Sequence, residues 1–138
     1  MSILDKPGPK YVDGNLRQTR ILVPEVINQA QGIVLLCRRI RSFVFTTDVC
    51  ILRNINADAI IAVYPFTPQP IITDALISSS EMPMLCGVGG GTTRGPRVTQ
   101  LAQHAEFQGA SGVVVNAPTP NETIRSMKAV LDIPIVVT

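Results

Sequence analysis

The residues best suited to bind a ligand lie in one glycine-rich stretch, residues 87–95. Glycine lets the backbone approach a ligand closely and adopt positive φ angles, so successive N–H groups can surround an anion. Threonine hydroxyls and one guanidinium add donors for a phosphate or a carboxylate. The predicted ligand-binding residues are Gly89, Gly90, Gly91, Thr92, Thr93 and Arg94. A plain turn between a strand and a helix is the alternative.

The spacing of this stretch argues against the common nucleotide motifs. No Gly-Lys-Ser/Thr follows the glycines, so the stretch is not a Walker A loop. It also lacks the G-x-G-x-x-G spacing of a dinucleotide site. The only histidine is His104, and no cysteine pair has metal-ligand spacing. We therefore predict neither a cofactor nor a metal site.

Two polar residues that follow predicted strands are candidates for catalysis. Asp48 could act as a general base or a metal ligand, but its carboxylate could equally cap a short helix. Asn116 could hydrogen-bond a substrate or belong to a turn. Tyr64 and Phe66 could line a pocket, although we expect them to pack in the core. His104 falls within a predicted helix, so we expect it at the surface rather than in catalysis.

Five short apolar segments set the predicted architecture. They contain little polar alternation, which is typical of parallel strands that are buried on both faces. The segments are residues 43–45, 59–63, 84–87, 113–115 and 133–137. Helical patterns separate them at residues 48–54, 71–79, 96–109 and 121–131. The alternation predicts an α/β fold of repeated βα units with a mainly parallel sheet.

The first 40 residues give weaker signals. Residues 1–20 are polar and show no sustained period, so we expect a flexible or partner-bound tail. Residues 21–138 are then one α/β domain. Apolar residues at three- and four-residue steps predict a helix over residues 23–40. Gly32 weakens this helix, and residues 33–37 could instead form a short strand.

The chain also contains an internal repeat. Residues 57–71 parallel residues 110–124 with one gap, and both copies lead through a helix to an acid–apolar–Pro–apolar sequence before the next strand. The repeats lie about fifty residues apart, which matches two βα units. Repetition of this kind is typical of half- and quarter-barrels.

On these residues the chain resembles part of a phosphate-binding (β/α)₈ barrel. The glycine-rich stretch is similar to the loops that follow strands in such barrels, and the helix–strand sequence of residues 103–116 also resembles the dihydrodipicolinate synthase/N-acetylneuraminate lyase class. That class implies a Schiff-base lysine on a strand. The lysines here, Lys6, Lys10 and Lys128, lie on no predicted strand, which argues against class I aldolase chemistry. Five strands allow a partial or half barrel, or a small open flavodoxin-like sheet.

Composition limits the class of partner. The net charge of +2 and the scarcity of aromatic residues argue against nucleic acid. No apolar run reaches the length of a membrane span, and we expect a cytoplasmic protein with its three cysteines reduced and buried. A charged fraction of only 16% and open sheet edges favour a homo-oligomer.

Two functional hypotheses follow. The first is a barrel-type protein, enzymatic or enzyme-derived, that binds a small phosphorylated or carboxylated metabolite at residues 87–95. Asp48 and Asn116 would then be its polar partners. The second is a non-catalytic ligand-sensing or assembly module that forms an oligomer.

Overall fold

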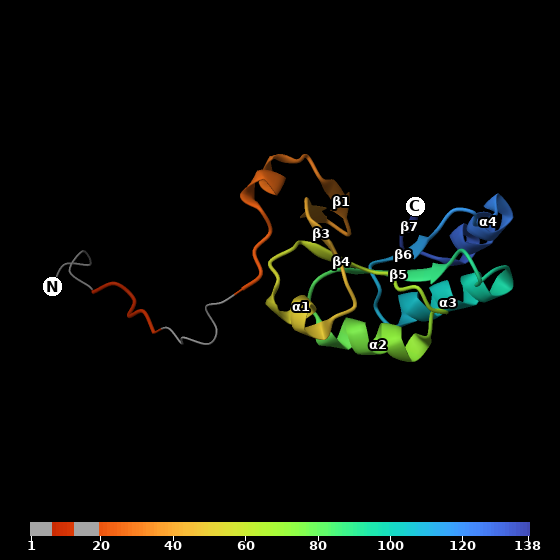
Figure 1. Ribbon diagram of the computed structural model, residues 1–138. Helices are drawn as coiled ribbons and strands as arrows, with labels where there is room; N and C mark the ends of the chain where they lie inside the picture. Colours follow the sequence, from red (N-terminus) through yellow and green to blue (C-terminus); the bar gives the residue numbers. More distant parts are fainter. Residues whose placement is uncertain (1–6, 13–19) are drawn as a thin grey trace.

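A five-stranded parallel sheet forms the centre of the protein. The computed structural model describes residues 7–12 and 20–138 (Figure 1). The strands follow one another in the sheet in chain order. They are β3 (Phe43–Phe45), β4 (Ala59–Ala62), β5 (Met84–Gly89), β6 (Gly112–Val115) and β7 (Ile135–Val137). The predicted strands are therefore confirmed, each within two residues at either end.

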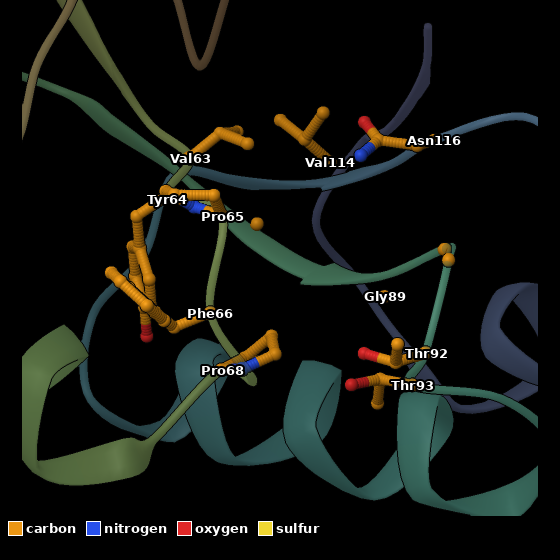
Figure 2. Close-up of a pocket in the computed structure, with 13 residues that line it drawn as sticks. Val63, Tyr64, Pro65, Phe66, Pro68, Gly89, Thr92, Thr93, Val114 and Asn116 are labelled. Carbon is orange, nitrogen blue, oxygen red and sulfur yellow. The ribbon is translucent and has the colours of Figure 1, made fainter.

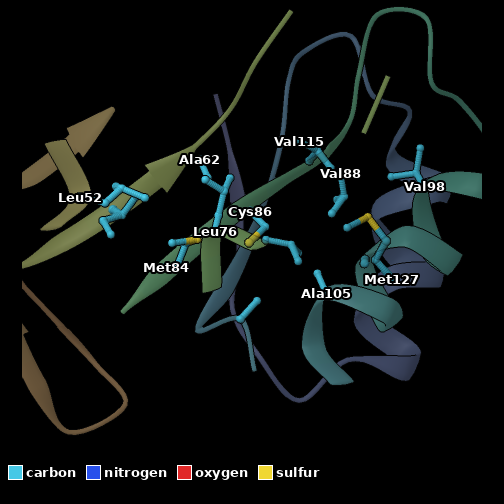
Figure 3. Packing of buried hydrophobic residues seen from close by; sticks show 14 residues of the cluster. Leu52, Ala62, Leu76, Met84, Cys86, Val88, Val98, Ala105, Val115 and Met127 are labelled. Atoms are coloured by element: carbon cyan, nitrogen blue, oxygen red, sulfur yellow. The ribbon is translucent and has the colours of Figure 1, made fainter. Parts of the chain in front are cut away.

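Four helices connect these strands, and all four pack on the same face of the sheet. They are α1 (Val49–Asn54), α2 (Pro70–Ser79), α3 (Pro96–Phe107) and α4 (Asn121–Val130). Leu52, Leu76, Ala105 and Met127 come from the four helices in turn and share one buried cluster with alternate strand residues such as Ile60 (Figure 3). Period-2 alternation of the strands thus sends every second side chain toward the helices.

The order of the strands decides between the two predicted architectures. Consecutive parallel strands with every helix on one face are what successive βα units of a (β/α)₈ barrel produce. A doubly wound, flavodoxin-like sheet would place helices on both faces and would change the strand order. The structure therefore confirms the partial-barrel expectation and not the open-sheet alternative.

The opposite face of the sheet is covered in part by a β-hairpin. Its strands are β1 (Ile33–Leu35) and β2 (Arg38–Ile40), and they lie across the sheet from the helices (Figure 1). Leu35 and Ile40 are buried there, in one cluster with Ile61, Leu85 and Val114.

The hairpin overturns the predicted helix over residues 23–40. Only Glu25–Gln29 forms a helical turn, of the 3₁₀ type. Gly32 has a φ of +70°, and Leu36 and Cys37 turn the chain with φ angles of 46° and 65°. Left-handed backbone of this kind ends a helix. The short-strand alternative for residues 33–37 was correct for its first three residues. The predicted tail, residues 1–20, falls mainly outside the described residues.

The three cysteines do not share one environment. Cys86 on β5 is buried, and burial raises the pKa of its thiol to about 12. Cys37 and Cys50 are exposed, so the expectation that all three are buried was wrong for these two. Among the described residues no helix is long and apolar enough to cross a membrane.

Candidate functional site

A pocket of about 260 Å³ lies at the carboxyl ends of β4, β5 and β6. Its lining consists of residues 63–66, Pro68, Gly87, residues 89–93, Val114 and Asn116 (Figure 2). Ligand sites of parallel α/β folds occur at this edge of the sheet because the connecting loops meet there. The structure thus gathers most of the predicted glycine-rich stretch around one cavity.

The floor of the pocket exists because Gly87 has no side chain. Gly87 pairs with Val114 on β6, and a Cβ atom added to Gly87 would lie 3.1 Å from Cγ2 of Val63. A larger residue at this position would fill the space between the two valines. The absent side chain therefore leaves a hollow between three neighbouring strands.

The loop after β5 supplies hydroxyl groups to the pocket. The amide of Gly90 donates to the carbonyl of Thr93 over 3.2 Å, which closes the turn. The hydroxyls of Thr92 and Thr93 both point toward the side of the pocket formed by Pro68 (Figure 2). Thr93 is only 5% exposed as a residue, and its hydroxyl lines the pocket; among the described residues the buried side-chain atom that lacks a hydrogen-bond partner is Oε1 of Gln108.

Asn116 forms the opposite side of the pocket. Its Oδ1 accepts a hydrogen bond of 2.9 Å from Oγ1 of Thr138, and its carbonyl accepts one of 2.6 Å from Oγ1 of Thr119. These bonds hold the side chain so that its amide nitrogen faces Val114 and the pocket (Figure 2). Asn116 thus lines the pocket and also closes a turn, since its carbonyl accepts from the amide of Thr119 over 3.0 Å. Its role in substrate binding stays a prediction.

The remaining wall is the segment after β4. The phenol oxygen of Tyr64 accepts a hydrogen bond of 3.0 Å from the amide of Gln69, which braces this segment. Tyr64 is half-buried, whereas Phe66 is 74% exposed. The expectation that both rings pack in the core was wrong for Phe66. Pro68 also lines the pocket and was not singled out from the sequence, since nothing distinguishes it from a turn proline.

Two predicted site residues lie outside this lining. The Nε of Arg94 donates to the carbonyl of Gly91 over 2.8 Å, so the guanidinium folds back on its own loop. Asp48 is the N-cap of α1, and its Oδ1 accepts from the amides of Cys50 and Ile51 at 2.8 and 3.4 Å. The structure thus gives Asp48 the capping role that was the alternative to catalysis.

The pocket lining as a whole carries no charged side chain. It offers hydroxyls, one carboxamide and backbone amides, of which those of Gly91 and Thr92 have no acceptor among the described residues. Within the same part of the chain, no three His, Cys, Asp or Glu side chains gather to hold a metal ion. Hydrogen bonds rather than ion pairs would therefore hold a ligand here.

The comparisons with known proteins concern the fold. A monomeric variant of dihydrodipicolinate synthase shares part of it. The likeness covers 59% of this chain and 33% of that protein, with 23% sequence identity and a TM-score of 0.47. The chain thus spans about a third of the protein that it matches. No protein-family model and no curated protein matches the sequence. The resemblance expected from the sequence is present in the structure, and it extends to the architecture only.

Two of the predicted ligand-binding glycines, Gly89 and Gly90, have a packing role in the structure. A Cβ atom on Gly89 would lie 2.6 Å from Cγ2 of Val98, and one on Gly90 would lie 2.7 Å from Cβ of Asn116. These glycines let α3 and the end of β6 approach the loop closely. The plain-turn interpretation therefore explains Gly89 and Gly90.

Proposed function

We propose that this protein binds a small metabolite through a carboxylate or phosphate group held in the pocket beside Thr93. The observation that supports this most is the position of Thr93, a residue that is only 5% exposed and whose hydroxyl lines the pocket. A hydrogen bond from this hydroxyl to a charged ligand oxygen would contribute about 1.5–3 kcal/mol.

Three kinds of donor converge on the proposed ligand. Thr92 and Thr93 supply hydroxyls, Asn116 supplies its carboxamide, and the loop supplies free backbone amides. Neutral donors bind an anion in a small cavity without the desolvation cost of a buried counter-charge. Since the lining offers no carboxylate, imidazole or amine, we assign these residues to binding rather than to acid–base catalysis.

The test compares two substitutions at one position. Thr93→Val keeps the shape of the side chain but removes the hydroxyl, and Thr93→Ser keeps the hydroxyl. We would titrate glycolate as the carboxylate probe and inorganic phosphate as the phosphate probe, and follow the backbone amides by NMR. The proposal expects saturable shifts at residues 89–93 with at least one probe, about tenfold weaker in Thr93→Val and retained in Thr93→Ser.

Equal affinity of wild type and Thr93→Val would remove the central support for the proposal. A complete lack of saturable shifts at residues 89–93 with both probes would refute it outright.

We also propose, as a second function, that the face of the sheet away from the helices associates with a second copy of the chain. Phe45 on β3 is 69% exposed, and it pairs with Ile61, whose side chain lies on the face away from the helices. Within the described part of the chain, β3 and β7 each pair on one side only. Exposed apolar side chains beside open strand edges favour association.

A further inference from the structure

A second cavity, of about 350 Å³, lies between the start of α2 and the surface of α3. It shares Pro68 with the first pocket, so the segment after β4 separates the two. We propose that this second cavity is a binding site for a phosphate group, held by Arg97 and His104. This inference goes beyond the proposed function, because it concerns a different site and different residues.

The sequence of α3 places both basic residues on one face of the helix. Arg97, Gln100, Leu101 and His104 follow the three- and four-residue spacing of a single helical stripe, and all four line the cavity. A neighbouring stripe, which includes Val98 and Ala105, is buried against the sheet. Burial of one stripe fixes the rotation of the helix, so the basic stripe has to face the cavity.

The other wall of the cavity is braced at both of its ends. The Nε2 of Gln108 donates to the carbonyl of Pro70 over 3.1 Å, which ties the end of α3 to the first residue of α2. The amide of Gln69 donates to the phenol oxygen of Tyr64. The first bond ties the start of α2 to the end of α3, and the second braces the segment that carries Thr67 and Pro68.

The second cavity, unlike the first, has a basic lining. Arg97 and His104 line it together with the polar side chains of Thr67 and Gln100, and no acidic residue does. The amino end of α2 adds positive potential, because Pro70, its first residue, is also part of the wall. A guanidinium fork with further N–H and O–H donors matches the oxygens of a phosphate.

The size of the cavity favours a ligand larger than a bare phosphate ion. The first pocket contains no charged side chain and is the smaller of the two, whereas the second combines charge with a larger volume. A volume of about 350 Å³ falls within the range of small-molecule sites and exceeds the space that a bare phosphate ion fills. The expected ligand is therefore a small phosphate monoester.

The experiment uses inorganic phosphate as the probe, with sodium chloride at equal ionic strength as the salt control. Backbone amide shifts would be followed by NMR in wild type, Arg97→Gln, His104→Gln and Arg125→Gln. Arg125 is a matched control, because it is an exposed arginine on α4 that lines neither cavity. We expect saturable shifts at residues 97–104, weakened at least about tenfold in Arg97→Gln and unaltered in Arg125→Gln.

Thr93→Val separates this inference from the proposed function. Phosphate binding at residues 97–104 should persist in Thr93→Val, because Thr93 does not line the second cavity. The inference is overturned if phosphate gives no saturable shifts at residues 97–104, if chloride reproduces them, or if Arg125→Gln weakens them as much as Arg97→Gln does.

Discussion

Gly90 lies in direct contact with Asn116: a Cβ atom on Gly90 would be 2.7 Å from Cβ of Asn116 and 2.8 Å from its carbonyl oxygen. The contact brings the loop after β5 against the end of β6. It is supported by a hydrogen bond of 3.1 Å from the amide of Asn116 to the carbonyl of Gly89. Both walls of the proposed binding pocket depend on this close approach.

Substituting Gly90 should therefore destabilise the protein more than substituting its neighbour. Both Gly90 and Gly91 have positive φ angles, +102° and +73°, but only Gly90 has atoms within 4 Å of the added Cβ position. Gly91→Ala should cost about 1–3 kcal/mol from backbone strain, and Gly90→Ala about 1–3 kcal/mol more from the clash. Urea unfolding of both variants measures the difference, and equal losses would contradict the close contact.

Removal of the Tyr64 hydroxyl should loosen the wall that the two cavities share. In Tyr64→Phe the amide of Gln69 loses its acceptor, at a cost of about 0.5–1.5 kcal/mol in the free energy of unfolding. Glycolate affinity should fall as well. The matched control is Tyr11→Phe, since Tyr11 is 88% exposed. If both variants behave like wild type in urea and in the titration, the hydrogen bond does not brace the wall.

Asp48 should act on stability and not on ligand binding. Asp48→Ala removes the N-cap of α1 and should lower the free energy of unfolding by about 1 kcal/mol, whereas Asp48→Asn keeps a capping oxygen and should lose less. Glycolate affinity should stay the same in both, because Asp48 does not line the pocket. A folded Asp48→Ala protein that no longer binds glycolate would instead support the catalytic-site interpretation.

Thiol reactivity should divide the cysteines into two groups. At pH 8 a disulfide reagent should modify Cys37 and Cys50 rapidly, since both are exposed. Cys86 should react only after unfolding, because burial raises the pKa of its thiol to about 12. The measurement is the number of protein thiols that react with and without urea. Three rapidly reacting thiols in the native protein would show that β5 opens readily.

The same pKa predicts how stability changes at high pH. Between pH 9 and about 12 the unfolded chain loses the Cys86 proton while the folded chain retains it, so this group's contribution to stability is complete below pH 9 and declines above it. The decline approaches about 1.4 kcal/mol per pH unit for one proton. Cys86→Ala is the reference, because its other titrating groups are the same. If the free energy of unfolding changes with pH in the same way in both proteins, the pKa of the Cys86 thiol is not raised in the folded state.

A charge on the open face of the sheet should prevent self-association. Phe45→Glu places a carboxylate on the exposed side of β3, and the mass in solution should fall to that of the monomer, 14.9 kDa. Phe107→Glu is the control, since Phe107 is 80% exposed at the end of α3, on the helix side. Light scattering at several concentrations decides the matter, and a wild-type monomer at all of them would exclude the second proposed function.

The sequence by itself determined the βα alternation and the edge of the sheet at which the glycine-rich stretch lies. Unbroken runs such as Ile60–Ile61 and Val113–Val115 mark strands buried on both faces, and parallel strands require that their carboxyl ends share one edge. The stop at Gly109 and the cap at Asp48 are local signals, so they were also within reach of the sequence.

Only the tertiary structure decided the partners of individual side chains. The contact of Gly90 with Asn116, the inward Thr93 hydroxyl and the folded-back Arg94 each depend on residues distant in the chain or on the path of a loop. The hairpin at residues 33–40 is also a tertiary effect, because the burial of Leu35 and Ile40 against the sheet outweighs a weak helical period interrupted by Gly32. A periodic pattern records which residues prefer burial, but the sheet decides the surface against which they are buried.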